Sequence, residues 1–228
     1  MDNQILARLM HVFNDHSELI KVLTSDICSI IESAIQKKGK AHLLLSGGST
    51  PIPLYKSLAS CDLDWNNIHI GLVDERMVDQ SSEFSNETLI RVAFKSAHTL
   101  HLSSMVLDLR DPINNLEHVT KNYAPFIAAD LVLLGMGDDG HTASLFPNDL
   151  ESELAMQDND TGICYTTAPN HPINRITCNR SMLISSSHLF LYFTGLKKLD
   201  KFKLAKQERT PIFHFENQLS AVYFTENT

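Results

Sequence analysis

One stretch of the sequence, residues 131–147, constrains the fold of this chain more than any other, because it joins a buried strand to a glycine-rich turn. It begins with four apolar residues, Leu131 to Leu134, and such a continuous run is typical of a parallel strand covered on both faces. Residues 135–140 follow the pattern Gly-x-Gly-x-x-Gly, which allows backbone conformations that a Cβ atom would forbid. Residues 142–146 are predicted to open a helix that ends at Pro147. The sequence therefore predicts a loop at the carboxyl end of a parallel strand, where open α/β sheets bind their ligands.

Acidic side chains and a histidine lie in this loop, since Asp138, Asp139 and His141 fall within four positions. A dinucleotide-binding fingerprint requires an acidic residue at the end of the next strand, roughly 20 residues further on. Residues 148–160 are instead polar and acidic, which predicts a solvated surface loop, and a histidine directly after the third glycine is foreign to a dinucleotide turn. Two interpretations of His141 remain, a catalytic base and a structural histidine that caps the turn, and the pattern favours catalysis.

A second glycine-containing loop follows a short apolar strand that is predicted at residues 41–45. The loop consists of Ser46, Gly47, Gly48, Ser49 and Thr50. A helix is predicted from residue 52 onward, with Thr50 as its N-cap and Pro51 as its first helical residue. Small residues with free main-chain N–H groups before a helix N-terminus form a cradle for an anion such as phosphate. The alternative is a tight turn in which the glycines serve geometry only.

Three charged residues, Asp74, Glu75 and Arg76, follow the strand that is predicted at residues 68–73. An arginine at this point would enter the same crevice, and its planar guanidinium matches the geometry of a phosphate or carboxylate. The alternative is a surface ion pair among the three charged side chains. Ser85 or Asn86 is predicted to cap the helix that comes next.

Length and charge limit the classes of function that this chain can have. At 228 residues it is predicted to form a single domain, residues 1–228, around one hydrophobic core. The formal net charge of −8 argues against nucleic acid as a partner, because a phosphate backbone selects a basic face. A small anionic ligand stays possible, because helix N-termini and a few arginines act locally.

The sequence carries no signal for a membrane or for secretion. Residues 1–10 lack the basic start and apolar core of a signal peptide, and no apolar run approaches the ~20 residues that span a bilayer. Four cysteines, Cys28, Cys61, Cys164 and Cys178, are scattered and lack Cys-x-x-Cys spacing. This distribution favours free thiols in a reducing cytoplasm over a cysteine-based metal site.

Helix and strand signals alternate along the rest of the chain. A long amphipathic helix is predicted between an N-cap at Asp15 and a terminator at Gly39. Strands are predicted at residues 162–168, 175–179 and 188–194, helices at 116–126, 181–186 and 199–205, and further structured segments at 212–215 and 221–225. This alternation predicts a three-layer α/β sandwich with a mainly parallel, Rossmann-like sheet. The three loops described above would then lie at one edge of the sheet, where together they suit a phosphorylated small molecule and a proton-transfer step.

Taken together, these loop sequences resemble the 6-phosphogluconolactonase family. The resemblance is carried by Ser46-Gly-Gly-Ser-Thr-Pro51, Asp74-Glu-Arg76, Ser85-Asn86, residues 135–147, Arg175-Ile-Thr177 and Gly195-Leu-Lys-Lys198. The first block is shared with sugar-phosphate deaminases and isomerases of the same superfamily, whereas the long block that ends at Pro147 is specific to the lactonases.

The resemblance implies an isomerase/deaminase-like fold and hydrolysis of 6-phospho-D-glucono-1,5-lactone to 6-phospho-D-gluconate in the oxidative pentose phosphate pathway, with no metal and no nucleotide cofactor. It implies that His141 is the general base. Arg76, Arg175 and Lys198 match positions that bind the substrate or its phosphate. The other candidate substrate-binding residues are Ser46, Gly47, Gly48, Ser49, Thr50, Asp74 and Asn86. We expect a cytoplasmic monomer or small homo-oligomer that binds a phosphorylated lactone.

The expected chemistry suits these residues independently of the resemblance. A δ-lactone is an activated ester, so its hydrolysis needs a positioned water, a base and stabilisation of the tetrahedral oxyanion. An imidazole ordinarily titrates near pH ~6.5, and a helix N-terminus beside His141 would favour the neutral ring that accepts a proton. Asp139, the second candidate catalytic residue, is expected either to orient that ring or to bind a sugar hydroxyl. No Gly-x-Ser-x-Gly elbow is present, which favours direct attack by water over an acyl-enzyme.

Two other functions stay open at this stage. The nearest is a 6-phosphosugar deaminase or isomerase on the same fold, although residues 142–146 follow the lactonase pattern. The other is a sugar-phosphate-sensing module of a transcription regulator, which binds without turnover. No helix-turn-helix pattern precedes the first predicted strand, and the net charge is unsuited to DNA.

Overall fold

The structure is a computed structural model that describes residues 9–227, so most of the segment considered above for a signal peptide, residues 1–8, lies outside the described part. Its centre is a parallel sheet with the strand order β1-β10-β9-β6-β2-β3-β5. The strands are β1 (Met10–Phe13), β2 (Ala41–Leu45), β3 (Ile68–Leu72), β5 (His101–Leu102), β6 (Leu131–Leu134), β9 (Leu189–Thr194) and β10 (Ala221–Thr225). The predicted parallel sheet is confirmed, and the edge strand β1 was not predicted.

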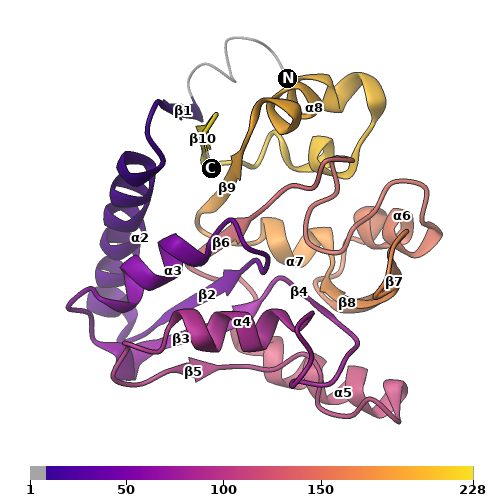
Figure 1. Cartoon of the computed structure of the whole chain (residues 1–228). Helices are drawn as coiled ribbons and strands as arrows, with labels where there is room; N and C mark the ends of the chain where they lie inside the picture. Colours follow the sequence, from indigo (N-terminus) through magenta and orange to yellow (C-terminus); the bar gives the residue numbers. More distant parts are fainter. Residues whose placement is uncertain (1–8, 228) are drawn as a thin grey trace.

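Helices cover both faces of this sheet. The helices of the described chain are α2 (His16–Lys38), α3 (Ile52–Ala59), α4 (Asn86–Ala93), α5 (Pro112–Tyr123), α6 (Leu150–Gln157), α7 (Arg180–Ile184) and α8 (Leu196–Glu208), with short 3-10 helices at Trp65–Asn67, Ala124–Phe126 and Pro211–Phe215. Of these, α6 packs against the strand at Ile163–Thr167 and against α7. Figure 1 shows α2, α3 and α4 side by side on one face. Because parallel crossovers are right-handed, α5, α7 and α8, which lead the chain back the other way, cover the opposite face. The three-layer α/β fold is therefore confirmed.

The direction of these crossovers reverses between β2 and β6, which are neighbours in the sheet. After β2 the chain moves outward to β3 and β5, whereas after β6 it moves to β9 and β10 on the other side. The loops that follow β2 and β6 therefore part at their carboxyl ends and leave an open crevice between them. Ser46 joins the two loops, because its Oγ donates to the carbonyl oxygen of Leu133 at 2.7 Å and accepts from the N–H of Gly135 at 3.0 Å.

A second, antiparallel sheet lies beside the carboxyl edge of the first, with the order β4-β8-β7. Its strands are β4 (Asp74–Arg76), β8 (Asn174–Cys178) and β7 (Ile163–Thr167). The β7–β8 pair follows the sequence prediction, but β4 was expected to be a loop. Three charged residues carry no strand signature, and β4 forms only because β8, about a hundred residues later, pairs with it.

The long helix α2 begins and ends where its sequence predicts. The carboxylate of Asp15 accepts a hydrogen bond from the N–H of Ser17 at 3.1 Å, and Gly39 ends the helix with a φ of 77°. Seven residues on one face of α2 are buried, which fixes the helix on the sheet. None of the helices in residues 9–227 combines the length and apolarity needed to cross a bilayer.

Three local predictions are wrong. Residues 142–146 form a turn, closed by a bridge between Thr142 and Leu145, and not a helix. Side-chain hydrogen bonds replace helical ones here, because Ser144 Oγ donates to Asp74 and Thr142 Oγ1 donates to the carbonyl oxygen of Gly135. Residues 148–160 contain the helix α6, which Asp149 caps, and are not a loop throughout. The N-cap of α3 is Pro51, without a side-chain bond, in place of Thr50.

The central strand β2 gives a direct test of the fold. Leu44 is fully buried there, so replacing it with alanine is expected to lower the free energy of unfolding by about 2–5 kcal/mol. Val92 on α4 is 66% exposed, and Val92→Ala should change the same quantity by less than about 0.5 kcal/mol. Denaturant unfolding of the two variants measures both values, and similar stability losses would contradict the assigned core.

Candidate active site

The crevice between the two loops is a cleft of about 280 Å³ at the carboxyl edge of the parallel sheet. Segments that lie far apart in the sequence meet here: the loops after β2 and β6, the sheet of β4 and β8, and the start of α8 (Figure 1). The candidate residues that line it are Ser46, Gly47, Gly48, Ser49, Thr50, Asp74, Arg76, Asn86, His141, Arg175 and Lys198. Asp139 is the one candidate outside this lining, and it contacts His141.

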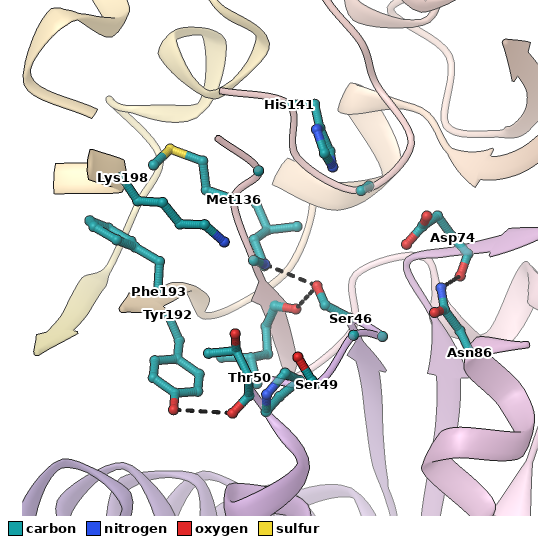
Figure 2. Close-up of a pocket in the computed structure, with 18 of the residues that line it drawn as sticks. Ser46, Ser49, Thr50, Asp74, Asn86, Met136, His141, Tyr192, Phe193 and Lys198 are labelled. Atoms are coloured by element: carbon teal, nitrogen blue, oxygen red, sulfur yellow. Dashed lines mark hydrogen bonds between the residues drawn. The ribbon is translucent and has the colours of Figure 1, made fainter. Parts of the chain in front are cut away.

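The loop after β2 presents free hydrogen-bond donors to the cleft. The main-chain N–H groups of residues 47–50 donate to no acceptor in the described part of the chain. Two tyrosines hold the loop. The hydroxyl of Tyr55 donates to the carbonyl oxygen of Ser46 at 2.5 Å. The hydroxyl of Tyr192 donates to the carbonyl oxygen of Thr50 at 3.3 Å (Figure 2). A fixed loop with unpaired N–H groups suits an anion.

Gly47 is required here because Asn86 approaches the backbone closely. A Cβ atom at Gly47 would lie 1.9 Å from Oδ1 of Asn86. The side-chain Nδ2 of Asn86 donates to the carbonyl oxygen of Asp74 at 3.1 Å, whereas its Oδ1 is buried and has no hydrogen-bond partner among the described residues. A buried acceptor without a partner is costly, so this oxygen is available to a donor on a ligand.

Arg76 and Arg175 lie directly opposite each other on β4 and β8. Neither guanidinium forms an ion pair with a carboxylate in residues 9–227; Arg76 donates to the oxygen of Phe84 and Arg175 to that of Pro172. Burial lowers the pKa of Arg175, and the charge of Arg76 lowers it further. Like charges that lie opposite each other in a sheet repel. An anion bound between the two guanidiniums would form charge-assisted hydrogen bonds with both and would reduce this repulsion.

His141 and Asp139 form a closely bonded pair. Oδ1 of Asp139 lies 2.5 Å from Nδ1 of the imidazole and 3.0 Å from the main-chain nitrogen of His141. Burial raises the pKa of Asp139, but the hydrogen bonds and charge of His141 outweigh it and hold that pKa below its usual value. Nε2 of the imidazole has no hydrogen bond in the described residues, which leaves it available to a ligand or a water. The turn at residues 142–146 provides no helix N-terminus beside this ring.

Phe146 connects the imidazole to the arginine pair. The centroid of the Phe146 ring lies 4.8 Å from the centroid of the His141 ring. Cζ of Arg175 lies 5.6 Å from the same Phe146 centroid. Lys198, in the first turn of α8, approaches from the other side, with Nζ 4.0 Å from a carboxylate oxygen of the largely exposed Asp138. Figure 2 shows His141 and Lys198 on different sides of the same pocket. In residues 9–227 no group of three or more His, Cys, Asp or Glu side chains is arranged to hold a metal ion.

Several residues that line the cleft were not among the candidates predicted from the sequence, among them Tyr192 and Met136. The hydroxyl oxygen of Tyr192 also lies 2.6 Å from Nε2 of His16, a residue at the start of α2. The sequence placed Tyr192 near the carboxyl end of a buried strand, the edge at which ligands bind. A polar hydroxyl within the apolar run 189–193 was the signal that could have identified it.

The chain belongs to a family of sugar-phosphate enzymes. Residues 14–223 match the model of the family described as "Glucosamine-6-phosphate isomerases/6-phosphogluconolactonase". The match covers most of the chain, including the loops after β2 and β6 that line the cleft.

Individual members of the family make the relationship closer. A protein of Pseudomonas aeruginosa named 6-phosphogluconolactonase is 33% identical over 83% of this chain and 82% of its own length. One of Helicobacter pylori with the same name is 30% identical over 94% of this chain and 97% of its own length. A crystal structure of a 6-phosphogluconolactonase from Shewanella baltica superimposes with a TM-score of 0.88 at 29% identity, covering 95% of this chain and 97% of that one.

Gly137 and Gly135 give a matched test of the loop geometry. A Cβ atom at Gly137 would lie 2.1 Å from Cε1 of His141, whereas one at Gly135 would lie 4.0 Å from its nearest neighbour, Cβ of Ser46. Gly137→Ala is expected to lower the free energy of unfolding by about 1–3 kcal/mol, because the ring or the loop must move. Gly135→Ala should change it by less than about 0.5 kcal/mol. Equal losses in a denaturant titration would refute the close packing of ring on backbone.

Proposed function

We propose that this protein hydrolyses 6-phospho-D-glucono-1,5-lactone to 6-phospho-D-gluconate, a step of the oxidative pentose phosphate pathway. The observation that carries the proposal is the shared cleft of His141, whose Nδ1 is bound to a carboxylate, and of an arginine pair without ion-pair partners. The family match and the relatives named 6-phosphogluconolactonase support it. The proposed compartment is the cytoplasm, and the proposed assembly is a monomer or small homo-oligomer.

The phosphate of the substrate needs cations and N–H donors at one end of the cleft. Arg76, Arg175 and Lys198 are the cations that line it, and the N–H groups of residues 47–50 are additional donors. Charge-assisted hydrogen bonds of this kind contribute about 1.5–3 kcal/mol each. The carboxylate of Asp74 and the free oxygen of Asn86 are acceptors for sugar hydroxyls.

His141 acts as the general base in this proposal. With Nδ1–H donated to Asp139, the neutral ring carries its lone pair on Nε2, the ring nitrogen that has no hydrogen bond within residues 9–227. Nε2 accepts a proton from water as the water oxygen attacks the lactone carbonyl, and the negative charge develops on the carbonyl oxygen. The ring C–O bond then breaks, and the leaving alkoxide takes the proton held on Nε2, which gives the hydroxyl of the open product and restores the neutral imidazole. Asp139 holds the tautomer and stabilises the imidazolium; the helix N-terminus that the sequence suggested has no part in this.

The rival activity within the family can be separated in one experiment. A 6-phosphosugar deaminase releases ammonia from glucosamine 6-phosphate, whereas a lactonase releases acid from freshly generated 6-phosphogluconolactone. We expect acid release above the spontaneous rate and no ammonia; ammonia release without lactone hydrolysis would contradict the proposal.

The role of His141 predicts a specific kinetic defect. His141→Ala should lower kcat by ~10²–10⁴-fold, because the general base is lost, while 6-phosphogluconate still binds to the intact donors. Initial rates and calorimetric titration measure these two effects. His118→Ala, on the exposed side of α5, is the control for loss of an imidazole. Turnover by His141→Ala at the wild-type rate would exclude the role.

Loss of one arginine of the pair is predicted to weaken substrate affinity and not the rate of the chemical step. Arg76→Ala should raise KM for the phosphorylated lactone and Kd for 6-phosphogluconate roughly 10- to 100-fold, because a charge-assisted bond to phosphate is lost. Hydrolysis of unphosphorylated gluconolactone should change little. Arg110, whose side chain is 95% exposed, provides the control Arg110→Ala. An unchanged KM and product affinity would count against phosphate binding by Arg76.

A further inference from the structure

One carboxylate near the cleft is not part of its lining. Side chains alternate along β4, so Asp74 and Arg76 face the cleft while Glu75 points to the other side. Glu75 is only 2% exposed. Its side chain turns toward the beginning of α4, where the cleft residue Asn86 lies.

Both oxygens of Glu75 are saturated by donors from two elements. Oε1 accepts from the main-chain nitrogens of Arg76 at 2.7 Å and Asn86 at 2.8 Å. Oε2 accepts from the main-chain nitrogen of Glu87 at 2.7 Å and from Oγ of Ser85 at 3.1 Å. The first N–H groups of a helix have no partner inside the helix, so this carboxylate supplies what the start of α4 lacks.

Burial and bonding act in opposite directions on this carboxylate. Burial raises the pKa of Glu75, and although the three backbone hydrogen bonds lower it, the pKa stays above its usual value. A buried carboxylate is tolerated only when its oxygens are fully bonded. Removal of these bonds would therefore leave Arg76 and Asn86 without their common attachment.

We propose that Glu75 is a positioning residue, which fixes the distance between Arg76 on β4 and Asn86 on α4 so that both can contact one substrate. The inference rests on the proposed function and adds a residue that touches neither the substrate nor the reacting atoms. Because Glu75 holds the backbone of Asn86, and Asn86 donates to Asp74, the free Oδ1 of Asn86 is held beside Gly47 at the cleft.

The charge of Glu75 gives a second reason for this arrangement. Burial and the charge of Arg76 lower the pKa of Arg175, and the charges of Asp74 and then of Glu75 act in the opposite direction. The oxygens of Glu75 are nevertheless occupied by main-chain N–H groups and a hydroxyl, and they bond to neither guanidinium. The carboxylate thus offsets part of the repulsion between the arginines while leaving their N–H groups for a ligand.

The test is the isosteric variant Glu75→Gln. A carboxamide has one acceptor oxygen, and its NH₂ group would face donors, so at least one bond to the start of α4 is lost. We expect KM for 6-phosphogluconolactone and Kd for 6-phosphogluconate to rise about tenfold, the equivalent of one modest hydrogen bond, with kcat within about threefold of wild type. The combined variant with Asn86→Ala should raise KM by less than the product of the single effects, because Glu75 acts partly through Asn86.

The matched control is Asp130→Asn. Asp130 is also a buried carboxylate that accepts a backbone N–H, from His42, but it lies at the amino edge of the sheet, away from the cleft. The Asp130→Asn variant should have a lower melting temperature than the wild type and an unchanged KM. If Glu75→Gln behaves in the same way, or if its effect is additive with that of Asn86→Ala, Glu75 is only structural and the inference is wrong.

Two further outcomes are separable. If Glu75→Gln does not fold, Glu75→Asp, which keeps the charge but is one methylene shorter, should show the same rise in KM, and a wild-type KM there would overturn the inference. Wild-type protein that fails to hydrolyse the lactone contradicts the proposed function. Active wild-type protein with an unchanged KM in the Glu75 variants contradicts the positioning role alone.

Discussion

The bridge made by Ser46 between β2 and β6 is the contact on which the site depends. Its hydroxyl bonds to Leu133 and Gly135 at the one place where neighbouring parallel strands send their crossovers in opposite directions. Within residues 9–227 no crossover passes over the carboxyl ends of these two strands, so the main-chain donors of one loop and the imidazole of the other face a common space. The second sheet and the start of α8 then complete the walls of that space.

The chemistry of the cleft follows from how its charges are distributed. The guanidiniums of Arg76 and Arg175 lie opposite each other and form no ion pair within residues 9–227. Two buried carboxylates close to them are bonded elsewhere, Asp74 to Ser144 and Glu75 to the start of α4. The cleft therefore keeps positive charge in a protein whose net charge is negative. Asp139 is a carboxylate that does contact a residue of the cleft lining, because it bonds to Nδ1 of His141 and so leaves Nε2 as the ring nitrogen that faces a ligand or water. The arginine pair and the imidazole therefore line one pocket from different elements, β4 and β8 for the arginines and the loop after β6 for His141.

Local patterns predicted most of the elements, and they failed where distant side chains intervene. The strand at Leu131–Leu134 and the helix between Asp15 and Gly39 depend on neighbouring residues only, and both were predicted. The prediction of a helix at residues 142–146 failed, because the turn there depends on a hydrogen bond from Ser144 to Asp74, seventy positions away. No local sequence pattern contains that contact. The helix α6 was missed because its acidic residues resemble a solvated loop, although Asp149 is a good N-cap.

The amino-acid sequence by itself determined the buried strands, the glycines in the loops after β2 and β6 and the kinds of side chain that these loops carry, because these depend on residue type and short spacing. The tertiary structure alone decided that Tyr192 reaches the loop after β2, that Arg76 faces Arg175 and that Glu75 holds β4 to α4. These contacts join residues that lie between ten and about 140 positions apart in the chain. Their geometry exists only after the crossovers have placed the strands, and hydrogen bonds of fixed length then select which side chains meet.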